Sequence, residues 1–161
     1  MKKRIDWVKL VIALAIPQLV GFIGSLFTTP SIDSWYSTLI RPSIAPPNWI
    51  FGPVWITLFV LMGISLYLIW NLGLNKKEVK FALVIFSIQL VLNMLWSIFF
   101  FGLHNPLLAF IEIIVLWVFI LLMIVYFYRI KNVAGYLQIP YFLWVSFAAV
   151  LNLMFVLLNQ F

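Results

Sequence analysis

The sequence contains no cysteine and only one histidine, and these two shortages exclude several classes of function. Without cysteine the chain has neither disulfides nor thiolate metal sites. The single histidine, His104, lies alone in a short polar turn, which leaves no His-rich metal cluster and argues against a Ser-His-Asp triad. No stretch supplies an activated nucleophile or a phosphate-binding loop. Enzymes that depend on any of these groups are therefore excluded.

Charged residues are also scarce. They make up 9% of the chain, whereas about a quarter is usual for soluble domains. Hydrophobic residues make up 66%, and the mean hydropathy is +1.17. This composition predicts an integral membrane protein, so the lipid bilayer is its first partner. A net charge of +6 would point to nucleic acid in a soluble protein, but membrane topology explains it here, and we expect no nucleic acid partner.

Five apolar runs are each long enough to cross a bilayer, which takes roughly 20 residues. Open strands cannot satisfy their backbone groups in lipid, so the spans should be helices. The sequence predicts an all-α membrane protein in which residues 1–161 form a single five-helix transmembrane domain. The expected spans are about 7–27, 50–72, 81–101, 106–128 and 135–158, and a structured lid loop is expected at 30–49. Pro30 should end the first helix, and Asn105-Pro106 resembles a helix cap followed by proline at the first position. The first run is too long for a cleaved signal peptide.

The basic residues predict how the chain lies in the membrane. Five spans place nine of the ten on one side: Lys2, Lys3, Arg4, Lys9, Lys76, Lys77, Lys80, Arg129 and Lys131. Only Arg41, in the first loop, falls on the other. By the positive-inside rule we expect a cytoplasmic N-terminus, with the first loop and the C-terminus outside. We expect the plasma membrane as the location.

The stretch from Trp35 to Trp55 combines stiffness with aromatic side chains. It holds three tryptophans, one tyrosine and four prolines. Proline fixes φ and removes a backbone donor, so this connection should be rigid. An interfacial anchor is the simpler interpretation, because indole rings suit a membrane surface. The density of proline and aromatic residues favours a lid over a pocket.

Polar side chains inside predicted spans are candidate site residues, because they are costly in lipid unless paired. Gln89, Asn93 and Trp96 share one helix face, and Asn152 shares another with Trp144. The alternative is hydrogen bonding between helices, which is equally plausible for Gln89 and Asn152. Asn93, beside a tryptophan, favours a pocket.

Two further features leave alternatives open. Glu112, in the fourth span, fits a proton site, a group with a polar partner, or a structural protonated carboxyl. Gly21 and Ser25 form a small-xxx-small pair, which is a weak indication of an oligomer contact.

Three motifs, in this order, resemble one known family. They are W-Y-x-x-L-x-x-P-x-x-x-P-P at 35–47 with F-G-P-V-W at 51–55, N-x-x-W-S-x-x-F-F at 93–101, and P-Y-x-x-W-x-x-F-A-x-x-L-N at 140–152. Together they resemble the translocator protein family, also called tryptophan-rich sensory proteins or peripheral benzodiazepine receptors. The resemblance covers the chain from Trp35 onward.

The resemblance implies a five-helix bundle whose ligand cavity is closed by the first loop. It implies a membrane receptor or sensor that binds tetrapyrroles such as protoporphyrin IX and haem, and isoquinoline carboxamide or benzodiazepine compounds. No cofactor is required, since porphyrin or haem is the ligand, and a homodimer is expected. Carried over position by position, the ligand-binding residues are Tyr36, Pro46, Pro47, Trp55, Phe59, Asn93, Trp96, Trp144, Ala148 and Leu151.

Two alternatives remain beside a binding protein. Some bacterial relatives degrade protoporphyrin IX in light, and the resemblance then implies Trp55 and Trp144 as catalytic residues. A small multidrug or ion transporter is the other alternative. Such a carrier usually places a charged residue centrally, and only Glu112 is available for that role.

Overall fold

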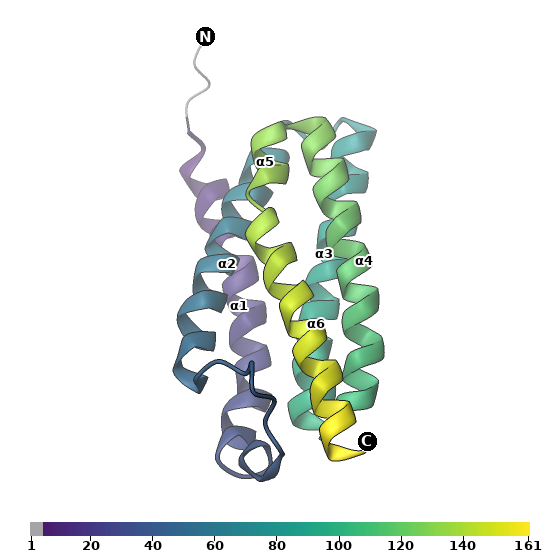
Figure 1. Cartoon of the computed structure of the whole chain (residues 1–161). Coiled ribbons are helices and arrows are strands. Elements are labelled where there is room, and N and C mark those ends of the chain that lie inside the picture. Colours follow the sequence, from purple (N-terminus) through teal and green to yellow (C-terminus); the bar gives the residue numbers. More distant parts are fainter. Residues whose placement is uncertain (1–4) are drawn as a thin grey trace.

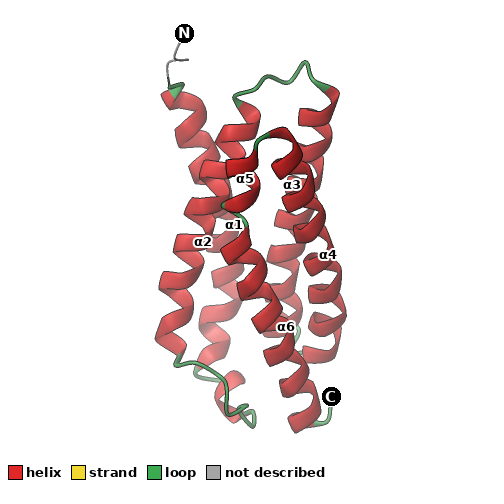
Figure 2. Cartoon of the chain, turned by 45° about the horizontal axis from the view of Figure 1, so that its top comes forward, coloured by secondary structure: helices red, strands yellow, loops and turns green. Residues whose placement is uncertain are grey.

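The computed structural model describes residues 5–161, which form helices and connecting turns without any strand (Figure 2). The elements are α1 (Trp7–Ile32), η1 (Tyr36–Thr38), α2 (Asn48–Trp70), α3 (Lys77–Ser97), η2 (Ile98–Gly102), α4 (Pro106–Ile130), α5 (Asn132–Tyr136) and α6 (Ile139–Asn159). Helix α3 continues into η2, and α5 continues into α6. With α1, α2 and α4, these two composite segments make five that are long and apolar enough to span a membrane. The predicted all-α, five-helix membrane fold is confirmed. Lys2, Lys3 and Arg4 of the topology argument lie outside the described residues.

Several helix ends differ from the sequence expectation; α3, for example, begins at Lys77, where a start near residue 81 was expected. The prediction that Pro30 ends the first helix is wrong, because α1 continues to Ile32. Proline's fixed φ is itself helical, and the Ser34 hydroxyl donates to the Pro30 carbonyl at 2.8 Å in the last turn. The third span ends in the π-helical turn η2. A turn at 137–138 divides the fifth span into α5 and α6.

Local capping explains where α4 begins. The Asn105 side chain accepts a hydrogen bond from the Leu108 backbone N–H at 2.9 Å, and Pro106 is the first helical residue. The predicted cap is confirmed.

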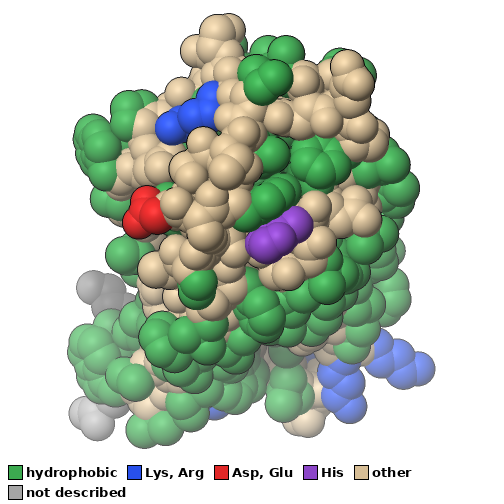
Figure 3. Space-filling view, turned by 90° about the horizontal axis from the view of Figure 1, so that it is seen from below, with side chains coloured by type: hydrophobic (Ala, Val, Ile, Leu, Met, Phe, Trp, Pro, Cys, Tyr) green, Lys and Arg blue, Asp and Glu red, His purple; other side chains and the backbone are tan. Residues whose placement is uncertain are grey.

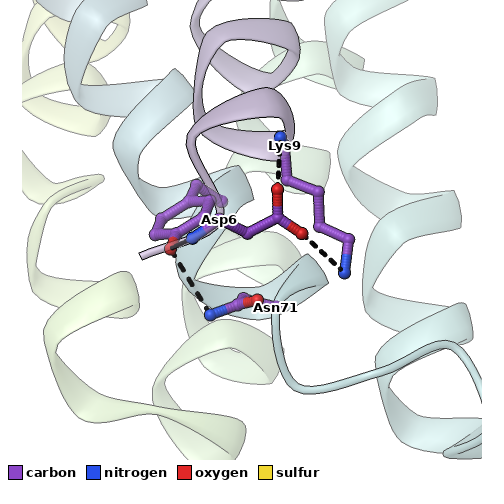
Figure 4. Close-up of polar contacts among 4 residues, drawn as sticks. Asp6, Lys9 and Asn71 are labelled. Atoms are coloured by element: carbon purple, nitrogen blue, oxygen red, sulfur yellow. Dashed lines mark hydrogen bonds and ion pairs between the residues drawn. The ribbon is translucent and has the colours of Figure 1, made fainter. Parts of the chain in front are cut away.

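The start of α1 is tied to the end of α2. Asp6 caps α1 by accepting from the Lys9 backbone N–H at 3.1 Å, and this bond lowers the pKa of Asp6. The Asp6 carboxylate also pairs with the Lys9 ammonium at 3.4 Å (Figure 4). The Tyr67 hydroxyl accepts from the Asp6 backbone N–H at 3.2 Å and from Asn71 Nδ2 at 3.4 Å. The two helices are therefore joined at the basic end of the bundle.

The helices form a ring around a shared core. Helix α1 packs along α2 and α3, α3 packs along α4, and α4 packs along α5 and α6. Helix α2 contacts the last span mainly through α5, and α6 then slants away from it (Figures 1 and 2). The α1–α2 connection and the C-terminus lie at one end of the bundle, opposite the N-terminus (Figure 1). The divergence of α2 and α6 towards that end leaves room for a cavity.

Candidate functional site

A mostly apolar cavity of about 630 Å³ opens in the loop half of the bundle. Its wall comes from α1, η1, α2, α3, η2 and α6. Ligand pockets commonly have volumes of about 300–1,000 Å³ and are lined by apolar side chains with a few polar groups. The cavity therefore has the size and character of a site for a small organic molecule.

Aromatic rings from opposite sides of the bundle build most of the wall. Trp55 stacks on Phe59 in α2, with ring centroids 5.4 Å apart, and meets Tyr141 of α6 edge-on at 6.2 Å. Trp144 of α6 packs against Phe51 of α2 at 5.8 Å. Because Trp55 and Trp144 both line the cavity, a flat ligand would lie between indoles that come from two different helices.

Eight of the ten residues singled out from the sequence border this one cavity. They are Tyr36, Trp55, Phe59, Asn93, Trp96, Trp144, Ala148 and Leu151. Pro46 lies instead on a separate, shallower depression with Val54, Leu58 and Pro140. Pro47 borders neither hollow. The two prolines thus shape the loop without contributing to the cavity surface.

The polar side chains of the cavity wall also join helices. Asn93 Nδ2 of α3 donates to the Tyr141 hydroxyl of α6 at 3.0 Å, and that hydroxyl donates to Gln89 Oε1 at 3.0 Å. Asn152 Oδ1 of α6 accepts from Trp96 Nε1 at 3.0 Å, while its Nδ2 donates to the Pro106 carbonyl at 2.8 Å. Asn93 and Asn152 therefore serve both the pocket and the helix contacts, whereas Gln89 lies fully buried behind the wall.

Among residues 5–161, no charged side chain lines the cavity. Glu112 is buried in α4, and neither of its carboxylate oxygens has a hydrogen-bond partner among residues 5–161. It does not border the cavity, so nothing in its surroundings gives it a direct role in binding there.

The first half of the loop is fastened to the ends of α3 and α6. Trp35 stacks on His104, with ring centroids 4.5 Å apart and an interplanar angle of 14°. Tyr36 packs among Phe100, Phe101 and Phe155, and burial raises the pKa of Tyr36. This aromatic cluster closes the cavity from the loop side.

A second fastening joins the loop to the C-terminal turn. The Ile40 backbone N–H donates to Asn159 Oδ1 at 2.8 Å, and Asn159 Nδ2 donates to the Ile40 carbonyl at 3.2 Å. Figure 3 shows this end of the molecule, where the histidine is exposed and charged side chains are sparse. These two hydrogen bonds therefore hold the loop against the C-terminal end of α6.

Sequence reasoning missed the contribution of α1. Gly21, Gly24, Ser25 and Thr28 line the cavity, although no residue of this helix was predicted to do so. A Cβ on Gly21 would collide with the Phe59 ring of the same chain. Gly21 is therefore part of an intrachain contact. The spacing of small residues was the available signal, but it does not reveal which helix they face.

Comparison with known proteins agrees with this geometry. The model of the TspO/MBR family matches residues 13–158. The chain belongs to the TspO/MBR family. It is 43% identical to the tryptophan-rich protein TspO of Chlorobaculum tepidum over 99% of both chains. It is 45% identical to the protein of the same name from Archaeoglobus fulgidus, over 94% of this chain and 97% of that one. It is 33% identical to the translocator protein of Bos taurus, over 91% and 87% of the two chains.

Membership of the TspO/MBR family confirms the resemblance carried by the three motifs. The family and the five apolar helices together make this a multi-pass integral membrane protein, with the bilayer as its surroundings. They support a role as a membrane receptor or sensor.

Proposed function

We propose that this TspO/MBR protein is a receptor or sensor that binds a flat aromatic ligand of the tetrapyrrole class, such as protoporphyrin IX or haem. The observation that carries the proposal is the cavity of about 630 Å³ with Trp55 and Trp144 in its wall. Offset or edge-on aromatic contacts are worth about 0.5–1.5 kcal/mol each beyond the area they bury. Isoquinoline carboxamide and benzodiazepine compounds, which are also largely aromatic, are proposed as further ligands of the same cavity.

Titration of the purified protein with protoporphyrin IX in the dark, followed by quenching of tryptophan fluorescence, tests binding. Ala148→Phe places a ring in the cavity wall and should weaken binding at least about tenfold, or 1.4 kcal/mol. Leu143→Phe is the matched control, because Leu143 is 61% exposed on the same helix and outside this cavity. Saturable binding that Ala148→Phe leaves intact would place the ligand elsewhere. Absence of binding to the wild type would overturn the proposal.

Light-dependent degradation of the porphyrin is the second candidate function. Trp55 and Trp144 border the same space, so both indoles would lie against a bound macrocycle. Trp55 also contacts Tyr141, whose hydroxyl belongs to the hydrogen-bonded chain with Asn93 and Gln89. An indole next to a photoexcited porphyrin can donate an electron to it or to the oxygen species it produces.

A further inference from the structure

Arg41 lies beside the cavity wall, in contact with two parts of the first loop. Its guanidinium carbon is 5.6 Å from the centroid of the Tyr36 ring, and Nη2 donates to the Pro46 carbonyl at 3.0 Å. Tyr36 lines the cavity, and so does Asn48, two residues after Pro46. The guanidinium is therefore held next to a residue of the cavity wall.

The contacts leave most of the guanidinium free. Arginine has five N–H donors, and only one hydrogen bond from Arg41 is present within residues 5–161. The ion pair in this described part of the chain joins Lys9 and Asp6, so Arg41 has no carboxylate partner there. Arg41 is exposed to solvent, and its positive charge partly opposes the effect of burial on the pKa of Tyr36. Its charge therefore acts at the cavity wall while its donors stay available.

The apolar cavity beside Arg41 suggests what its positive charge could bind. No charged side chain of residues 5–161 lines the cavity, so an ionised group of a ligand would be poorly accommodated inside it. Arginine's planar fork matches the two oxygens of a carboxylate, and the cation–π contact holds the Arg41 guanidinium near the Tyr36 ring. An amphipathic ligand would place its aromatic body in the cavity and its acid group beside Arg41.

We propose that Arg41 is a specificity-determining residue that pairs with a carboxylate of the ligand at the loop end of the cavity. The inference rests on the proposed binding function and adds the chemical class to it: the preferred ligands are flat aromatic acids, oriented with the acid group towards the loop end. Uncharged aromatic compounds of the same shape bind without this contact.

The test compares protoporphyrin IX, which carries two carboxylates, with its dimethyl ester, which carries none. Both are titrated in the dark against the wild type, Arg41→Gln and Arg41→Lys. Arg41→Gln should weaken binding of the diacid about three- to tenfold, the range expected for an exposed but pre-oriented ion pair. Binding of the ester should stay within about twofold. Arg41→Lys keeps the charge but loses the planar guanidinium. Its affinity for the diacid should therefore lie between those of the wild type and Arg41→Gln. Raising the salt concentration should weaken only diacid binding by the wild type.

The outcomes separate this inference from the function on which it rests. Equal losses for diacid and ester in Arg41→Gln would show that Arg41 only supports Tyr36, and would overturn the inference. Unchanged diacid affinity would overturn it as well, while the binding function stands. Failure of the wild type to bind either compound would overturn the proposed function itself.

Discussion

At the scale of single residues, several side chains both line the cavity and stabilise the packing of the helices. Asn93 and Asn152 face the cavity and also hold helices together through hydrogen bonds. Trp55 and Trp144 each fill wall area and present an indole to a ligand. Substitutions at these positions must therefore be chosen so that the packing and the chemistry can be measured separately.

Trp55→Phe and Trp144→Phe separate binding from photochemistry. Phenylalanine keeps an aromatic face and most of the buried area, but donates an electron far less readily. Dark affinity for protoporphyrin IX should change by less than about tenfold, which is 1.4 kcal/mol. Light-driven loss of the porphyrin absorption band should slow markedly in both variants.

Free porphyrin under the same lamp is the control, because porphyrins bleach without protein. Equal rates in the wild type and the double variant at matched occupancy would show that the two tryptophans only bind. If porphyrin bound to the wild type is lost in light no faster than free porphyrin, the enzymatic alternative is wrong and the binding function stands.

Tyr141→Phe tests the hydrogen-bonded chain behind the wall. The change removes one oxygen and leaves Asn93 Nδ2 and Gln89 Oε1 without that partner in the interior. Each unsatisfied buried group costs about 1–3 kcal/mol, so the melting temperature in detergent should fall clearly. Tyr126→Phe is the control, because no hydrogen bond of the Tyr126 hydroxyl is found among the described residues. Equal melting temperatures for the two variants would contradict a structural role for the hydrogen bonds that join Asn93, Tyr141 and Gln89.

At the scale of elements, two contacts join the segments around the site. The loop is fastened to the turn after η2 and to α6 by aromatic stacking and by the Asn159–Ile40 pair. Helices α1 and α2 approach each other closely at Gly63. The first contact lies at the loop end of the cavity, and the second joins two of the helices that line it.

Asn159→Ala should speed ligand release. The substitution removes both hydrogen bonds to Ile40, each worth about 0.5–1.5 kcal/mol, so the first half of the loop would open more often. We expect the dissociation rate of protoporphyrin IX, measured by stopped-flow fluorescence, to rise about three- to tenfold with little change in association rate. Gln160→Ala, one residue further on, is the control. An unaltered dissociation rate in Asn159→Ala would show that the aromatic cluster alone holds the loop.

Gly63→Ala should destabilise the bundle even though alanine favours helix. An added Cβ would lie 2.7 Å from the Leu14 Cα and 2.8 Å from the Ala13 carbonyl oxygen. Backbone cannot move aside cheaply, so we expect a loss of about 1–3 kcal/mol, read as a lower melting temperature. Gly52→Ala in the same helix meets no atom within 4 Å and should be neutral or stabilising. Equal behaviour of the two variants would contradict the close packing of α1 on α2.

At the scale of the whole molecule, the bundle has two chemically different ends. Lys9, Lys76, Lys77, Lys80, Arg129 and Lys131 belong to the end where the described chain begins, and Arg41 belongs to the loop end. Assembly is a separate matter. The homodimer stays a prediction, and Gly21 no longer supports it, because Gly21 faces Phe59 of its own chain.

Reporter fusions test the orientation. One fusion placed after Phe161 and another within residues 75–79 should report opposite sides of the membrane, with the second in the cytoplasm. The expectation follows from the excess of basic residues at the N-terminal end. The same side for both reporters would contradict a five-span arrangement, and a cytoplasmic C-terminus would reverse the orientation.

The sequence by itself determined the number of spans, their helical nature and the family. In lipid only helices and closed barrels satisfy the backbone, so uninterrupted apolar runs of this length are enough to find helical spans. The motifs at 35–47, 93–101 and 140–152 also pointed to part of the cavity wall, because their residues repeat at helical spacing or belong to the loop.

Only the tertiary structure decided which faces meet and what closes the site. Periodicity identifies a face of a helix but not its neighbour, so the contribution of α1 and the contact of Gly21 with Phe59 could not be foreseen. Pro46 and Pro47 stiffen the loop, yet their side chains lie off the cavity, because a loop's path depends on what it packs against. The Asn159–Ile40 pair joins residues 119 positions apart, and the Arg41–Tyr36 contact depends on the fold of the loop. Contacts of this kind arise only when the helices assemble, since no local pattern encodes them.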